Sequence, residues 1–141
     1  MSKKQQDPIT GGLPNPTERE LEIVRVLWKQ RAASVREVLE RLNRERVEPL
    51  AYTTVLRFLQ IMTEKGLVTR EDGVRGHLYS TSVPAESTKR QLAHDLIERA
   101  FEGSAHDLML HALGGRKITQ EELGEIRKLV EELHDKEEKS S

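Results

Sequence analysis

Residues 50–80 read LAYTTVLRFLQIMTEKGLVTREDGVRGHLYS, and within this stretch the hydrophobic period changes from that of a helix to that of a strand. The first half has apolar side chains three and four positions apart, a spacing that places them on one face of a helix. This helix is expected to begin near Tyr52 and to end at Gly66, because glycine readily adopts the left-handed conformation that follows a last helical turn. Its predicted buried face consists of Val55, Phe58, Leu59 and Met62.

The second half of the stretch predicts a β-hairpin. Leu67–Arg70 and His77–Ser80 have the short length and the two-residue alternation of strands. Residues 71–76 lie between them and include two glycines, which are typical of a turn.

Two more helices are expected before this stretch, each with a capping box at its start. In Thr17-Glu-Arg-Glu20 and in Ser34-Val-Arg-Glu37, a hydroxyl and a carboxylate three residues apart can each accept from a free backbone N–H. Apolar residues at helical spacing follow both motifs, which predicts helices over 17–30 and from 34 to about 44. Three short helices followed by a hairpin are the element order of a winged helix-turn-helix.

After Pro84 the pattern is helical again. Three segments have apolar stripes at helical spacing but almost no aromatic residues to form a core of their own. Such stripes usually bury themselves against a partner, so we expect this tail to make the protein a homodimer. The alternative is that the tail folds back on its own head. The expected dimerisation residues are Leu92, Leu96, Ile97, Phe101, Leu108, Met109, Leu113, Leu123, Ile126, Leu129, Val130 and Leu133.

The expected fold class is therefore mainly α with a small β-hairpin, in which a winged helix-turn-helix head precedes a helical dimerisation tail. Residues 1–83 contain 14 Lys and Arg against 11 Asp and Glu, whereas residues 84–141 contain 9 against 13. A basic head and an acidic tail suit a protein whose head reads DNA while its tail assembles. The predicted parts are a flexible N-terminal arm (1–16), a winged-helix DNA-binding domain (17–83), a helical dimerisation domain (84–135) and a disordered tail (136–141).

Composition restricts the class of protein. The 141 residues include no cysteine, which excludes disulfides, zinc sites built on thiolates and cysteine nucleophiles. No apolar run has the ~20 residues of a membrane span, and the N-terminus lacks the apolar core of a signal peptide. We therefore expect a cytoplasmic protein without membrane insertion.

Catalysis is not expected. The five histidines are scattered, and none has a carboxylate at a recognisable metal-binding spacing. The sequence has no nucleophile motif, no glycine loop for phosphates and no dinucleotide fingerprint. We accordingly predict no catalytic residue, no metal ligand and no cofactor.

The start of the third helix carries the candidate residues for base contact. In a helix-turn-helix, the second helix of the pair enters the major groove with its N-terminal residues toward the base edges. Thr53, Thr54 and Arg57 lie away from the apolar stripe, and arginine can donate two hydrogen bonds to guanine. Tyr52 could reach a phosphate or pack on a sugar. The alternatives are helix capping by the threonines and a merely solvated Arg57.

The hairpin carries the candidate residues for backbone contact. Arg75 and His77 are at or beside its tip, from which an arginine can follow the phosphates or enter a narrow minor groove. Such contacts govern affinity and salt dependence more than sequence preference. Arg36 and Arg41 in the second helix are weaker candidates.

The chain resembles the BlaI/MecI family of penicillinase repressors from about Leu13 to Leu133. The segments that carry the resemblance are Pro16–Val24 with Leu27-Trp28, Ser34–Val38, Leu50–Val55 with Leu59, Lys65–Val68, and Arg75-Gly-His77 with Tyr79. The resemblance implies a homodimer that binds a double-stranded DNA operator with dyad symmetry and TACA/TGTA-like half-sites. It also assigns recognition to Thr53, Thr54 and Arg57, a wing contact to Arg75, and dimerisation to the helices after Pro84.

Such repressors usually control β-lactamase or related genes, often with a membrane-embedded sensor metalloprotease and cleavage in the first tail helix. The Asn-Phe step that is cleaved in the family corresponds to Asp95-Leu96, and neither residue matches. The C-terminal cysteine cluster of copper-responsive relatives has no counterpart here. Two other functions stay open: a winged-helix module that docks a protein partner, and a repressor with a small-ligand pocket between head and tail.

Overall fold

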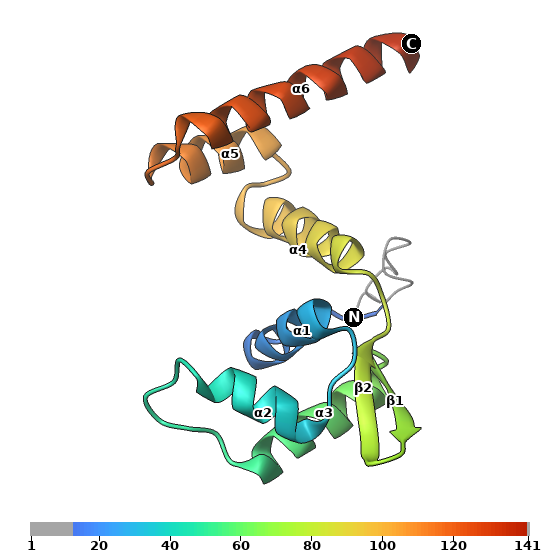
Figure 1. The fold of residues 1–141 in the computed structure, drawn as a ribbon. Coiled ribbons are helices and arrows are strands. Elements are labelled where there is room, and N and C mark those ends of the chain that lie inside the picture. Colours follow the sequence, from blue (N-terminus) through green and yellow to red (C-terminus); the bar gives the residue numbers. More distant parts are fainter. Residues whose placement is uncertain (1–12, 141) are drawn as a thin grey trace. The chain divides into compact units, whose positions relative to one another are not determined.

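The computed structural model describes residues 13–140 (Figure 1). In chain order, the elements are α1 (Glu18–Gln30), α2 (Val35–Asn43), α3 (Tyr52–Lys65), β1 (Val68–Gly73), β2 (Gly76–Thr81), α4 (Ala85–Ala100), α5 (Ala105–Gly114) and α6 (Gln120–Ser140). This order confirms the predicted fold class. The chain divides into two compact units, of which the first ends at Asp95 and the second begins at Leu96. None of the helices described here is long and apolar enough to cross a membrane.

Both predicted capping boxes are present. At the start of α1, the Thr17 hydroxyl accepts from the Glu20 N–H at 3.3 Å, and the Glu20 carboxylate accepts from the Thr17 N–H at 2.9 Å. Ser34 and Glu37 repeat this exchange at the start of α2, at 3.1 and 2.8 Å. These local hydrogen bonds explain why the first two helices begin where the sequence predicts.

The start of α3 is held differently. Its N-cap is Ala51, which has no side-chain capping bond, so neither threonine caps this helix and that alternative is wrong. Asn43, at the end of α2, instead accepts from the Leu50 N–H at 2.8 Å and donates to the Leu50 carbonyl at 3.1 Å. The turn between the two helices is thus fixed by one amide side chain.

The core of the first unit lies where α1, α2, α3 and the hairpin meet. Three of the four residues predicted for the buried face of α3 are fully enclosed, whereas Phe58 is half-buried at the edge of the core. Gly66 ends α3 with a φ of +86°, as expected for a left-handed stop. The apolar core consists of Ile23, Val24, Val26, Leu27, Ala33, Val35, Val38, Val55, Leu59, Met62, Leu67, Val68 and Tyr79.

The hairpin is longer than predicted. Its strands pair in antiparallel register from Val68 opposite Thr81 to Gly73 opposite Gly76, so the turn contains only two residues instead of the expected six. The reason is that Gly76, at φ +123°, permits a tight reversal that few other residues tolerate. Tyr79 anchors the hairpin by exchanging backbone hydrogen bonds of 2.8 and 3.0 Å with Ala33, in the segment between α1 and α2.

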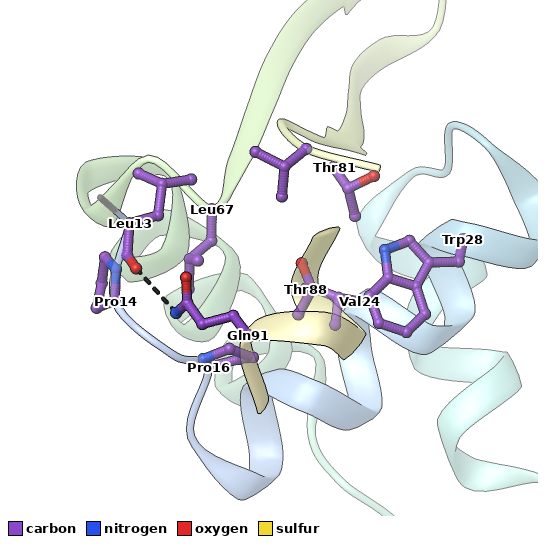
Figure 2. A pocket seen from close by; sticks show the side chains of 10 residues that line it. Leu13, Pro14, Pro16, Val24, Trp28, Leu67, Thr81, Thr88 and Gln91 are labelled. Atoms are coloured by element: carbon purple, nitrogen blue, oxygen red, sulfur yellow. Dashed lines mark hydrogen bonds between the residues drawn. The ribbon is translucent and has the colours of Figure 1, made fainter. Parts of the chain in front are cut away.

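Residues 13–16 are held against the first unit, which corrects that part of the predicted flexible arm; residues 1–12 lie outside the described chain. Leu13 packs on the core, and its carbonyl accepts from the side chain of Gln91 in α4 at 3.2 Å (Figure 2). Gln91 also donates to the Asn15 side chain, which in turn donates to Asp95 at 3.1 Å. We call residues 13–16 the strap, because they fasten the first half of α4 to this unit.

In the second unit, the helices begin at capped positions and α6 extends further than expected. The Ser104 hydroxyl accepts from the Asp107 N–H at 2.9 Å, and Thr119 accepts from Glu122 at 3.0 Å. Residues 136–140 are helical, whereas the sequence predicted disorder from 136; Ser141 lies outside the described chain. Strong helix formers such as Glu and Lys dominate this segment, which explains its continuation.

Candidate nucleic-acid interface

A groove lies between α3 and the hairpin and is open to solvent. The start of α2 forms part of it, so three separate elements contribute side chains. The groove contains three of the predicted DNA-contact residues, Tyr52, Arg75 and His77, and two polar residues that the sequence did not single out, Gln60 and Arg70. The full lining is Ser34, Val35, Arg36, Tyr52, Leu56, Gln60, Arg70, Arg75, Gly76, His77 and Tyr79.

The first turns of α3 present the predicted recognition residues unequally. Thr53 and Arg57 are exposed and lie four positions apart, so they share one helix face, which Gln60 continues. Thr54 is half-buried, since it neighbours the enclosed Val55. Of the two threonines, Thr53 is therefore the more accessible to a ligand.

The register of the hairpin decides which of its side chains face the groove. Arg70 is paired with Tyr79, and Asp72 with His77, and residues paired across a ladder point to the same side. Because Tyr79 is buried against the core, Arg70, Asp72 and His77 lie on the inner side of the hairpin. The sequence did not identify Asp72, because the predicted strands were too short to include the pair Asp72–His77. Arg70 lay within a predicted strand, but the register that pairs it with Tyr79 was not predicted.

His77 already has a partner. Its Nδ1 lies 2.7 Å from Oδ1 of Asp72, so the carboxylate holds the imidazole in place within the hairpin. The same carboxylate adds a negative charge to the inner side, where a phosphate would approach. His77 is consequently a less direct candidate for DNA contact than the sequence suggested.

Three guanidinium groups line the groove, those of Arg36, Arg70 and Arg75. Within residues 13–140, none of the three forms an ion pair with a carboxylate. Guanidinium groups from α2 and from the hairpin that lack a carboxylate partner among these residues suit the geometry of phosphate oxygens.

A second groove, between α1 and the end of α2, has a different charge pattern. It contains Arg41, the other cation considered as a phosphate candidate, together with Arg25 and Lys29. Two glutamates also line it, and Glu22 pairs with Arg46 at 3.6 Å. Arg41 therefore lies apart from the groove of α3 and the hairpin, whereas Arg36 lines that groove.

The predicted dimerisation residues remain accessible in the single chain. No residue from Leu96 to Ser140 is buried, although the three helices there contain many aliphatic side chains. Leu92, Ile97, Phe101, Leu108, Leu113 and Ile126 are half-buried, whereas Leu96, Met109, Leu123, Leu129, Val130 and Leu133 are exposed. Leu110, which is not among the predicted dimerisation residues, is also exposed.

One group of potential metal ligands does not follow a recognised spacing motif. Ligand atoms of His134, Asp135 and Glu138 lie within 4.8 Å of one another near the end of α6. All three side chains are exposed, so water competes for every one of them, and acidic groups of this kind are common on protein surfaces without a metal.

Comparisons with known proteins identify the family. The family model described as penicillinase repressor matches residues 16–132, which is most of the chain and extends from α1 into α6. The penicillinase repressor of Bacillus licheniformis is 22% identical over 120 residues, which cover 85% of this chain and 92% of the relative. The methicillin resistance regulatory protein MecI of Mammaliicoccus sciuri is 20% identical over 111 residues, covering 79% and 89%. The resemblance predicted from the sequence is thus confirmed, and the chain belongs to the penicillinase repressor family of DNA-binding transcriptional regulators.

Proposed function

We propose that this protein is a transcriptional repressor that binds an operator of dyad symmetry as a homodimer. The observation that carries the proposal is the groove between α3 and the hairpin, next to the exposed first turns of α3. Three guanidinium groups line it, and none of them has a carboxylate partner among residues 13–140. A helix of this kind fits the major groove of DNA, and an adjacent hairpin then meets the sugar-phosphate backbone.

The residues divide into two roles within this proposal. Thr53 and Arg57 contact base edges, because both are exposed on one face of α3. Thr54 has a smaller part, since it is half-buried. Arg70 and Arg75 contact phosphates from the hairpin, which raises affinity for every sequence.

The tail residues supply the proposed dimer interface. A segment of 45 residues without one buried side chain gains too little hydrophobic free energy to offset the conformational entropy lost on folding. In α6, Leu123, Ile126, Val130 and Leu133 follow the three-four-three spacing of a coiled-coil seam. A second copy of the chain offers the same stripe and can cover it.

We propose residues 17–83 as the DNA-binding domain and residues 84–135 as the dimerisation domain. Residues 84–95 of the latter belong to the first compact unit, so the interface lies mainly in the residues after Asp95. Two heads related by a twofold axis contact half-sites about one helical turn apart on the same side of the duplex.

We propose that the protein controls genes of the β-lactamase type. The names of the relatives support this, because they refer to penicillinase and to methicillin resistance. A membrane sensor protease would have to cut near Asp95-Leu96, within α4. The chain differs there from the Asn-Phe step of the family, so we propose a repressor that stays intact when β-lactam is added to cells. Immunoblotting of the full-length chain before and after β-lactam addition tests this point.

The DNA proposal is tested by fluorescence anisotropy at near-physiological salt. A duplex with TACA and TGTA half-sites is compared with a scrambled duplex of the same composition. We expect a preference of about 10³-fold or more and two protomers per specific duplex.

Equal, salt-sensitive binding to both duplexes would mean that the operator has another sequence. No binding to either duplex at low salt would contradict the proposal and favour a protein-docking module. One protomer per specific duplex would contradict the dimer alone.

A further inference from the structure

We infer that Arg36 contacts a DNA phosphate and that Tyr52 is a positioning residue, whose ring holds the guanidinium of Arg36 toward the groove. The inference rests on the proposed function and deepens it. It changes the role expected for Tyr52, which the sequence placed in direct contact with DNA.

The geometry joins the starts of two helices. Arg36 is the second residue of α2 and Tyr52 is the first residue of α3. The guanidinium carbon of Arg36 lies 5.6 Å from the centre of the Tyr52 ring, within the range of a cation–π interaction. Both side chains line the groove between α3 and the hairpin.

Arg36 has no evident structural task. A cation in the first turn of a helix is disfavoured by the helix dipole, so its charge does not stabilise α2. Among the described residues, its guanidinium has no carboxylate within ion-pair distance. By contrast, Arg46 pairs with Glu22 at 3.6 Å on the other side of the head. A free guanidinium fixed by stacking on a ring keeps its N–H donors available for a phosphate.

Tyr52 offers the face of its ring as a stacking surface for Arg36. Its side chain is 42% exposed, and no hydrogen bond of its hydroxyl occurs in the described part of the chain. The ring therefore stacks on Arg36, and its hydroxyl makes no hydrogen bond to the described residues that would explain its position otherwise. Stacking limits the rotamers of the long arginine side chain, which reduces the entropy lost when a phosphate binds.

The experiment measures anisotropy of the full-length protein with the TACA/TGTA duplex and the scrambled duplex over a series of salt concentrations. Arg36→Ala is expected to weaken both duplexes about fivefold and to lower the slope of log K against log salt by about one. Tyr52→Ala is expected to weaken both about two- to fivefold. The conservative variant Tyr52→Phe restores the loss, because it keeps the ring. The double variant Arg36→Ala with Tyr52→Ala is expected to be no weaker than Arg36→Ala.

Arg25→Ala is the matched control, since Arg25 is an exposed arginine of the head that lines the other groove. It should keep the wild-type salt slope. Circular dichroism melts of each variant separate loss of binding from loss of folding.

Three results would overturn the inference: an unchanged salt slope in Arg36→Ala, a loss in Tyr52→Phe as large as in Tyr52→Ala, or additive losses in the double variant. If the wild-type protein fails to bind either duplex, the proposed function itself fails. The two failures are therefore distinguishable.

Discussion

At the scale of single residues, Arg57 and Arg75 have different tasks in the proposed interface, and substitution separates them. Arg57 is exposed on α3, whereas Arg75 forms half of the two-residue hairpin turn. Arg57→Ala is expected to cost ~1–3 kcal/mol of operator binding and to relax the preference at one base position. Arg75→Ala should weaken all duplexes alike and reduce the salt slope by about one. Competition titrations with single-base operator variants at several salt concentrations measure both effects.

The assignment would be wrong if Arg75→Ala changed the base preference and left the salt slope intact. Arg44→Ala serves as a control, since Arg44 is exposed at the end of α2 and is absent from the groove of α3 and the hairpin.

Glu20 shows how one residue can serve two elements. The residue is 2% exposed, and its carboxylate caps α1 and accepts from Lys65 of α3 at 2.8 Å. Burial alone would raise the pKa of Glu20, but the hydrogen bonds from Lys65 and Thr17 outweigh it and leave the pKa below its usual 4.5. A carboxyl whose pKa is lowered by folding stabilises the fold above its unfolded pKa, and this contribution is lost as the pH falls through the folded pKa.

Glu20→Gln is therefore expected to destabilise the first unit by about 1–3 kcal/mol at pH 7. The difference from wild type should shrink as the pH is lowered from 5 toward 3, because the wild-type carboxyl then becomes protonated. Urea unfolding at a series of pH values measures it. Glu40→Gln, at an exposed position in the middle of α2, should show no such pH-dependent difference. A difference for Glu20→Gln that is constant across the range would contradict the role of the charge.

At the scale of elements, the sequence predicted the helix ends that depend on interactions between residues close together in the chain. The capping boxes of Thr17 and Ser34 and the left-handed Gly66 involve neighbours within a few residues, so the sequence located these helix ends well. The strap was missed because Gln91 is 78 residues away from Leu13 in the chain, and no periodic pattern reports such a contact. The pair of Asp72 and His77 is close in the chain and was missed for a different reason: it depends on the strand register, which the sequence did not predict.

The strap yields a prediction for α4. Gln91→Ala removes the side-chain donor to both Leu13 and Asn15, so the first half of α4 loses its attachment through this side chain. Amide hydrogen exchange is expected to become faster in residues 88–95 of α4 and to stay unchanged in the buried part of α1. Arg90→Ala, at an exposed neighbouring position, is the control. Uniformly faster exchange across the whole first unit would indicate general destabilisation instead of a released strap.

At the scale of the whole molecule, the single chain leaves its second unit without a core, and no sequence pattern can reveal what covers an exposed stripe. The periodicity of α6 identified the apolar residues, but their side chains stay accessible, with Val130 57% and Leu133 55% exposed. The proposed function requires a second copy at this stripe, because one head contacts only one half-site.

Val130→Asp is therefore expected to convert the protein to a monomer at micromolar concentration, because a carboxylate at the centre of an apolar seam is costly to bury. The monomer should bind the full operator no more tightly than an isolated half-site, because its head is no longer linked to a second one. Sedimentation velocity measures the mass, and anisotropy on whole and half operators measures the linkage. Lys128→Asp introduces the same group at an exposed position outside the seam and should leave the dimer intact. If Val130→Asp remained dimeric, the second copy would bind elsewhere; if the wild-type protein were itself a monomer at this concentration, the proposed dimer would be excluded.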